Sequence, residues 1–287
     1  MKTRFFQTAA KIGLMLLLMV NSACFRRFQM TEKEIETFFA DKGGVPPSYW
    51  LNEGNLPVHW VQTGSDSLPL LLFIHGAPGA WYGYIQLMAN TKLKKHFALA
   101  SVDRPGYHRS GKAGKQVSIQ EQARLISGIL RNNPERPVYI LGRSYGAPIA
   151  AEIAARYPKQ VRGLMLVAPA ADPDKEKFWW FSPLVQYPPL RWIFPKPIRR
   201  ASSEKYAHRR ELRKMVNSWS EVTCPTQILQ GGKDFIVYPS NACFVDSAMC
   251  SSQRLVRFLP ENGHLITREQ PELVVDLLIE LKQGRLY

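Results

Sequence analysis

Short apolar runs alternate along this chain with segments whose apolar residues recur at helical spacing. A run that is apolar at every position is typical of a parallel strand covered on both faces of a sheet. Strands are expected at residues 58–61, 70–74, 97–102, 138–141, 161–167, 227–229 and 255–258, and helices at residues 118–131, 147–156 and 271–282. This alternation predicts an α/β fold built on a doubly wound, mostly parallel sheet.

Residues 24–55 precede this pattern and are interpreted as a tether followed by an N-terminal arm. Thr31, with Glu34 three residues later, has the spacing of a capping box at a helix start. The helix should end in the glycine- and proline-containing stretch at residues 43–47. The arm is expected to dock onto the main domain.

Residues 171–220, called the cap segment below, show no clean strand pattern. They hold four of the seven tryptophans, together with clustered prolines and many basic residues. This composition favours a helical cap inserted over the functional site, which divides the α/β core into residues 56–170 and 221–287. The alternative is a helical excursion that only packs on the core.

The first 23 residues have the features of an export signal. Basic residues precede a short apolar run at residues 12–20, and a Ser-Ala-Cys sequence ends at Cys24. The run is too short to span a bilayer comfortably. Cysteine after Ser-Ala resembles a bacterial lipobox, although Asn21 stands where such signals usually carry Leu. We expect an exported protein held at the periplasmic or outer-membrane face by lipid on Cys24; a plain signal peptide and an uncleaved anchor are the alternatives.

The charge of the chain agrees with a membrane surface as a partner. The net charge is +15, and it remains +12 without the first 23 residues, which contain three basic and no acidic ones. No nucleic-acid motif accompanies this charge, which is spread along the chain, so nucleic acid is not an expected partner. Anionic membrane lipid is an expected partner of this basic chain. Cys243 and Cys250 could pair in an oxidising compartment, and the four cysteines show no metal-ligand spacing.

The most informative motif is Gly142-Arg143-Ser144-Tyr145-Gly146. It lies between a predicted strand and a predicted helix, which is the context of a nucleophile elbow. Glycine is needed on both sides because the strand and the helix approach closely, and the helix directs its positive N-terminal end at the turn. Ser144 is therefore the candidate nucleophile, in preference to an ordinary glycine and serine turn.

A serine hydroxyl requires a base, an acid that orients the base, and donors for the oxyanion. His264, in a flexible turn after the last predicted strand, is the candidate base. Asp234, which follows Gly231-Gly232-Lys233, is the candidate acid. Asp172 and Asp174, after the strand that ends at residue 167, are the alternatives for the acid.

In this order of Ser, Asp and His, the chain resembles the α/β-hydrolase superfamily over roughly residues 56–284. The likeness is greatest to members with an H-G-x-P-G loop, which His75-Gly76-Ala77-Pro78-Gly79 matches. It implies that the N–H groups of Ala77 and Tyr145 form the oxyanion hole. It also implies a structural role for Asp103, in the loop after the fourth strand.

The substrate pocket is harder to assign. Pro78, Arg143 and, from the cap segment, Trp179 and Trp180 are the candidates, with the ring of Tyr145 as a further wall. Relatives often carry His where Arg143 stands. Arg143 is expected either to form an internal ion pair, which is favoured, or to hold an acidic group of the substrate.

The resemblance implies a serine hydrolase that cleaves an ester or amide of a small to medium molecule through an acyl-enzyme, with no cofactor and no metal. A carboxylesterase is favoured; prolyl aminopeptidases, which normally have another Gly at position 77, and C–C bond hydrolases stay open. Serine at the elbow argues against the related epoxide hydrolases and haloalkane dehalogenases, whose nucleophile is a carboxylate. A non-catalytic binding protein on this fold is the alternative from another class, and the oligomeric state is left open.

Overall fold

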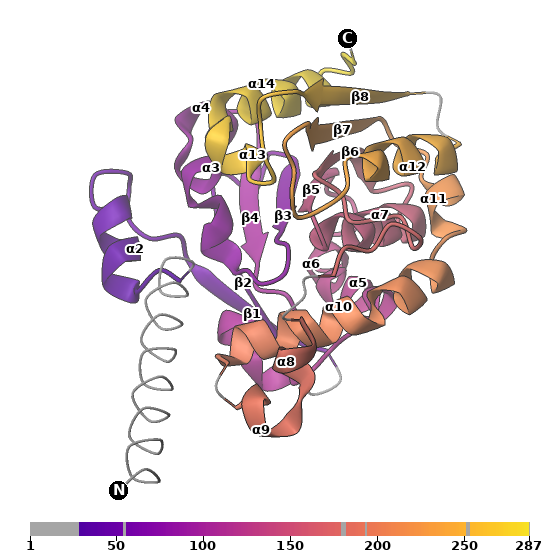
Figure 1. Ribbon diagram of the computed structural model, residues 1–287. Coiled ribbons are helices and arrows are strands. Elements are labelled where there is room, and N and C mark those ends of the chain that lie inside the picture. Colours follow the sequence, from indigo (N-terminus) through magenta and orange to yellow (C-terminus); the bar gives the residue numbers. More distant parts are fainter. Residues whose placement is uncertain (1–28, 54–55, 179–181, 193, 251–252, 287) are drawn as a thin grey trace, which may run out of the picture.

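An eight-stranded sheet forms the centre of the molecule (Figure 1). The computed structural model describes residues 29–53, 56–178, 182–192, 194–250 and 253–286. The strand order is β1-β2-β4-β3-β5-β6-β7-β8, with bounds Ser48–Glu53 (β1), Leu56–Thr63 (β2), Leu70–Ile74 (β3), Ala98–Val102 (β4), Val138–Arg143 (β5), Val161–Val167 (β6), Thr226–Gly231 (β7) and Arg254–Leu259 (β8). β2 pairs antiparallel with β1 and β4, and all other neighbours are parallel. The predicted doubly wound, mostly parallel sheet is confirmed.

Helices cover both faces of the sheet. One face packs against α2 (Glu32–Phe39), the 3₁₀ helix η1 (Trp81–Tyr84), α3 (Ile85–Ala89), α4 (Thr91–Lys94), α13 (Ile266–Glu269) and α14 (Pro271–Lys282). The other packs against α5 (Ile119–Ile126), α6 (Gly128–Arg131), α7 (Gly146–Arg156), α11 (Ser218–Glu221) and α12 (Ser240–Ala248). The chain also forms a 3₁₀ helix, η2 (His108–Ala113), after β4.

The strand β3 shows why its sequence is apolar throughout. Leu70, Leu72 and Ile74 belong to one hydrophobic core, and Leu71 and Phe73 belong to the other. Successive side chains of a strand point to opposite faces, so a strand covered on both faces needs no polar position. The central strands thereby form a rigid base whose carboxyl ends carry the loops of the candidate site.

The cap segment leaves the sheet after β6 and returns to it at β7. It contains α8 (Ser182–Gln186), α9 (Pro188–Arg191) and the long α10 (Lys196–Lys214), followed by α11. In Figure 1 these first three helices lie together at the bottom of the molecule, below the sheet. Glu204, His208 and Leu212 of α10 are buried, so this helix packs its inner face firmly on the core.

The N-terminal arm contains one predicted element and one that was missed. Thr31 and Glu34 form the expected capping box at the start of α2. β1 was not predicted, because Pro46 and Pro47 and the polar residues around the strand resemble a loop. The helix expected at residues 118–131 is divided at Ser127 into α5 and α6. Within the described ranges, none of the helices combines the length and the apolar composition needed to cross a bilayer.

Candidate active site

Ser144 occupies the sharp turn between β5 and α7. Its φ is 53°, in the left-handed region that residues other than glycine rarely adopt. The flanking glycines are required by close backbone approach. A Cβ on Gly142 would lie 2.5 Å from the carbonyl oxygen of Gly146, and a Cβ on Gly146 would lie 2.3 Å from that of Ile74. This is the strand–turn–helix geometry of a nucleophile elbow.

Asp234 and His264 are joined by a hydrogen bond between two buried side chains. Oδ2 of Asp234 lies 2.7 Å from Nδ1 of His264, while Oδ1 accepts from the N–H groups of Ile236 at 2.8 Å and Val237 at 2.9 Å. Burial raises the pKa of Asp234, but the hydrogen bond and charge of His264 and the two N–H donors outweigh it, so the pKa lies below its ordinary value. The carboxylate is therefore ionised and fixed in one orientation against the imidazole.

The two loops that carry this pair lie against each other, since they follow the neighbouring strands β7 and β8. A Cβ on Gly231 would lie 2.2 Å from the carbonyl oxygen of Gly263, so a side chain there would force the loops apart. The alternative acid, Asp174, is exposed and accepts from Arg213 at 3.0 Å and from Arg209 at 3.5 Å. The structure thus joins Asp234, and not Asp174, to the candidate base.

The loop after β3 is oriented by His75 and Arg104. Nδ1 of His75 donates to the carbonyl oxygen of Gly76 at 2.7 Å, and the Arg104 guanidinium donates to the same oxygen at 3.1 Å. The backbone N–H of Arg104 donates to Nε2 of His75 at 3.0 Å, which leaves Nδ1 as the protonated nitrogen. Because a peptide unit is planar, fixing the Gly76 oxygen on one side directs the Ala77 N–H to the other.

The environment of His75 keeps its imidazole neutral. The side chain is completely buried, and loss of solvation is the largest cause that lowers its pKa to about 3; the positive charge of Arg104 acts in the same direction. A neutral imidazole can donate from one nitrogen and accept at the other, as the two hydrogen bonds require. His75 is thus suited to hold the loop and not to exchange protons near neutral pH.

Two backbone N–H groups beside Ser144 are available as donors. Within the described part of the chain, the N–H groups of Ala77 and Tyr145 meet no acceptor. Gly76 brings its loop close to the serine, since a Cβ on Gly76 would lie 3.0 Å from the Ser144 Cβ. Unused N–H groups of this kind are what an oxyanion hole requires.

A cavity of about 250 Å³ has Ser144 in its wall. Ala77, Pro78 and Tyr145 come from the core, and the cap segment supplies much of the remaining wall. The cap residues include Lys177, Val185, Ile198, Lys205, Tyr206 and His208. Pro78 therefore lies where the sequence interpretation expected it. Trp179 and Trp180 lie outside the described residues, as does Cys24.

Arg143 differs from expectation. Its guanidinium donates to the Thr267 hydroxyl at 3.3 Å and lies over the Tyr84 ring at 5.7 Å. Among the described residues it has no carboxylate partner within ion-pair distance and no part in the cavity wall, so the favoured internal ion pair is wrong. The reason is the side chain's direction: it lies on the α13 side of β5, away from the cavity.

A buried polar network that the sequence did not reveal joins the loop after β3 to the cap segment. Arg104 makes a bidentate ion pair with Glu204 of α10, at 2.7 and 3.0 Å. Tyr107 donates to Glu204 at 2.5 Å, and Gln122 bridges the two charged groups. The guanidinium also lies over the rings of Tyr107 and Tyr145, at 4.7 Å from each.

His208, which lies in the cavity wall, also pairs with a carboxylate. Nδ1 of His208 is 2.6 Å from a carboxylate oxygen of Glu176, which also pairs with Lys205. The His208 ring stacks on Tyr145 with 4.5 Å between ring centroids. This pair holds the start of the cap segment against α10. In the sequence, only the basic composition of the cap segment indicated that this region contributes to the site.

Three side chains that could ligate a metal lie together beside β2 and β4. His59, His108 and Asp103 bring possible ligand atoms within 4.8 Å of one another. Oδ2 of Asp103 lies 2.7 Å from Nδ1 of His59 and 2.9 Å from Nδ1 of His108, and Oδ1 accepts from the Trp81 N–H. These are hydrogen-bond distances, shorter than ligand atoms around one zinc ion would be at bond lengths of roughly 2.0–2.1 Å. The arrangement agrees with a structural Asp103.

The cysteines that the structure describes are free thiols. Cys224 is buried, and Cys243 and Cys250 are exposed and unpaired. Burial raises the pKa of the Cys224 thiol to about 12, which makes it unreactive.

Residues 69–219 match the family model described as alpha/beta hydrolase fold, so the match covers more than half of the 287 residues. The chain is 33% identical over 112 residues to Epoxide hydrolase 1 of Caenorhabditis elegans, covering 38% of this chain and 27% of that protein. It is 34% identical over 114 residues to the Pimeloyl-[acyl-carrier protein] methyl ester esterase of Yersinia enterocolitica, covering 39% and 40%. The chain thus spans less than half the length of these curated relatives.

Solved structures share the whole architecture at low sequence identity. A crystal structure of a membrane phospholipase A, described as a bacterial virulence factor, superposes with a TM-score of 0.67 over 99% of both chains, at 19% identity. At this identity the likeness concerns the fold alone.

Proposed function

Since the chain belongs to the alpha/beta hydrolase fold family, we propose that it is a serine hydrolase that cleaves an ester of a small to medium molecule through an acyl-enzyme. The hydrogen-bonded pair of Asp234 and His264 carries this proposal, because it follows β7 and β8 at the sheet edge where Ser144 follows β5. The unused N–H groups of Ala77 and Tyr145 beside the serine support it.

The chemistry assigns one role to each group. His264 removes the hydroxyl proton as Ser144 attacks the carbonyl carbon, and the N–H groups of Ala77 and Tyr145 stabilise the negative oxygen that forms. His264 then protonates the leaving group, and water enters by the same steps in reverse to release the acid. Asp234 holds the imidazole and supports its transient positive charge.

An ester is favoured over the other bonds that this fold cleaves. One matched relative is a methyl ester esterase, whereas the matched epoxide hydrolase belongs to enzymes that, by the family resemblance, use a carboxylate nucleophile where this chain has Ser144. The cavity of about 250 Å³ fits an acyl or alcohol group of modest size. Amides and C–C bonds are alternatives that substrate screening separates.

The location proposed for the enzyme is the cell envelope. The basic start, the apolar run at residues 12–20 and Ser-Ala before Cys24 support export and lipid attachment at that cysteine. Cys24 is followed by a short arm and then by the hydrolase core, with the cap segment as the part that selects the substrate.

A serine-reactive fluorophosphonate probe and ester hydrolysis test the mechanism together. Ser144→Ala should abolish labelling and lower kcat by at least about a thousandfold, while the circular dichroism spectrum is preserved. Ser247→Ala, on the exposed side of α12, is the matched control and should label normally. Normal turnover by Ser144→Ala would reject Ser144 as the nucleophile. A wild-type protein that neither labels nor cleaves any ester or amide would favour a binding protein.

A further inference from the structure

The outer surface of the cap segment concentrates exposed apolar side chains. Most of the large hydrophobic side chains that are exposed in the described structure lie in this segment or in residues 235–238 beside the cavity. Trp192 is 75% exposed and Tyr187 is 58% exposed, which is unusual for side chains of their size. Exposed apolar groups gathered in one part of a molecule indicate a contact surface.

Positive charge surrounds these side chains. The cap segment contains eleven Lys and Arg residues and five Asp and Glu residues. Three of the acidic groups are already engaged inside the protein: Glu204 pairs with Arg104, Glu176 with Lys205 and His208, and Glu211 with Arg210 and Lys214. The basic residues outnumber the acidic ones, so the cap segment carries a net charge of +6.

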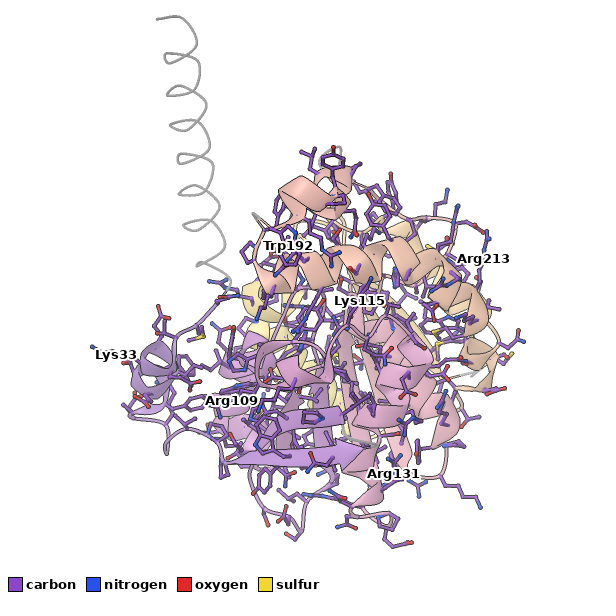
Figure 2. All side chains as sticks on the ribbon, turned by 90° about the horizontal axis from the view of Figure 1, so that it is seen from below. Lys33, Arg109, Lys115, Arg131, Trp192 and Arg213 are labelled. Atoms are coloured by element: carbon purple, nitrogen blue, oxygen red, sulfur yellow. The ribbon has the colours of Figure 1, made fainter. Side chains whose placement is uncertain are left out.

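The aromatic and basic side chains are interleaved. Arg199 lies over the Trp192 ring at 4.9 Å, and Tyr206 shares a shallow groove with Arg209, Arg210, Arg213 and Lys214. Figure 2 views the molecule from the cap side and shows Trp192 beside the start of α10 and Arg213 near its end. Tryptophan, tyrosine and cations in this combination suit the boundary between lipid headgroups and acyl chains.

The described chain begins beside this surface. Gln29 and Met30 line a second cavity, of about 150 Å³, together with Pro78 of the loop after β3 and Ile198 of α10. Cys24 is five residues before Gln29 in the sequence. Since an extended chain advances at most about 3.6 Å per residue, this stretch can span no more than roughly 20 Å. A lipid on Cys24 would hold the bilayer close to the cap segment.

We propose that the outer surface of the cap segment, centred on Trp192 and the cationic side of α10, docks onto an anionic lipid bilayer. The aromatic side chains enter the headgroup region and the basic side chains bind lipid phosphates. Docking orients the cavity that contains Ser144 toward the membrane, so that the ester substrate is drawn from the lipid layer. The orientation rests on the proposed envelope location, whereas the lipid affinity of the cap surface is independent of it.

Hydroxyl-radical footprinting of the full-length chain tests the proposal without depending on catalysis. The protein is mixed with vesicles of phosphatidylcholine alone or with roughly a third of phosphatidylglycerol, and side-chain oxidation is measured by mass spectrometry. Oxidation of Trp192 should slow at least about threefold on the anionic vesicles. Phe258 is the internal reference, because it is exposed on β8, at the opposite end of Figure 1 from α8–α10.

Charge-neutralising variants identify the surface. Arg213→Gln with Lys214→Gln should remove most of the protection of Trp192. Lys159→Gln with Arg162→Gln removes two exposed cations, one just before β6 and one at its start, and should leave the protection in place. The Ser144→Ala protein should give the wild-type footprint, so loss of the hydrolase mechanism would not be mistaken for loss of docking.

Three results would overturn the proposal. The first is equal oxidation of Trp192 on neutral and anionic vesicles. The second is protection of Phe258 in place of Trp192. The third is protection of Trp192 by a DNA duplex but not by vesicles, which would identify a general polyanion surface.

Discussion

Glu204 of the cap segment and Arg104 of the core form a buried bidentate ion pair, and Arg104 is also a donor to the Gly76 carbonyl. The Arg104 side chain thus bridges the cap helix α10 and the peptide that presents the Ala77 N–H. The cap is therefore connected mechanically to the candidate oxyanion hole, and a displacement of α10 would be transmitted to the reacting groups.

Replacement of Glu204 should impair turnover as well as stability. Glu204→Gln leaves the buried Arg104 charge without a counterion, which typically costs about 3–5 kcal/mol in the free energy of unfolding. The freed guanidinium no longer holds Gly76, so kcat for a small soluble ester should fall by about tenfold or more, with a smaller change in KM. Thermal unfolding and steady-state kinetics measure the two effects.

Glu211→Gln is the matched control on the same helix. Glu211 is also buried, but its partners Arg210 and Lys214 are exposed and distant from Gly76 in the hydrogen-bond network. It should lower stability less and leave kcat near the wild-type value. A Glu204→Gln protein that is destabilised but turns over normally would show that the network supports the fold alone.

The sequence indicated the groups whose position depends on local chain geometry. Apolar runs located the central strands, since those strands are covered on both faces. The spacing of glycines placed Ser144 in a turn, and residue order placed Asp234 and His264 in loops after β7 and β8. Edge strand β1 escaped detection because most of its described residues are exposed and it follows two prolines.

Pairings across the molecule could not be predicted in the same way. Arg104 and Glu204 are 100 positions apart, and Glu176 and His208 are 32 apart, so nothing local in the sequence marks them as partners. Arg143 was expected to meet a carboxylate, but the side of β5 from which its side chain leaves is fixed only by the packed sheet. The pairings of Glu204 and His208 depend on how the cap segment packs on the core, and the contact of Arg143 depends on how α13 packs on the sheet.

Cys24→Ser should release the protein from the membrane fraction. The motif that ends at Cys24 supports attachment of lipid, and two acyl chains hold a protein stably where one does not. In a host with lipoprotein processing, wild-type protein should incorporate a labelled fatty acid and the variant should not. Cys243→Ser, which removes another exposed thiol, should stay membrane-bound and labelled. A soluble, unlabelled wild-type protein would contradict lipid attachment.

Asp234→Asn should be far more damaging than Asp174→Asn. The amide cannot orient the imidazole correctly or balance its positive charge, so kcat should fall by up to about 10⁴. Asp174 is exposed and pairs only with cap arginines among the described residues, so its replacement should change kcat by less than about threefold. Fluorophosphonate labelling rates and ester kinetics give the comparison. The reverse ranking would assign the acid to Asp174.

Stability should decline on mild acidification because of His75. Folding lowers the pKa of this residue from 6.5 to about 3, so the unfolded chain binds a proton that the folded one excludes. Stability is therefore lost as the pH falls from about 6.5 toward 3, and by about 2 kcal/mol between pH 6 and pH 4.5. Urea unfolding at a series of pH values measures this slope.

His75→Asn separates the titration of His75 from that of the other groups. The asparagine amide can still donate to the Gly76 carbonyl, but its oxygen does not reach the position at which Nε2 accepts from the Arg104 N–H, so the variant should be less stable at every pH. It cannot take up the proton, and its stability should therefore fall by about 2 kcal/mol less than that of the wild type over the same interval. Parallel curves for the two proteins would mean that His75 is protonated in the folded state and does not hold the loop as a neutral imidazole.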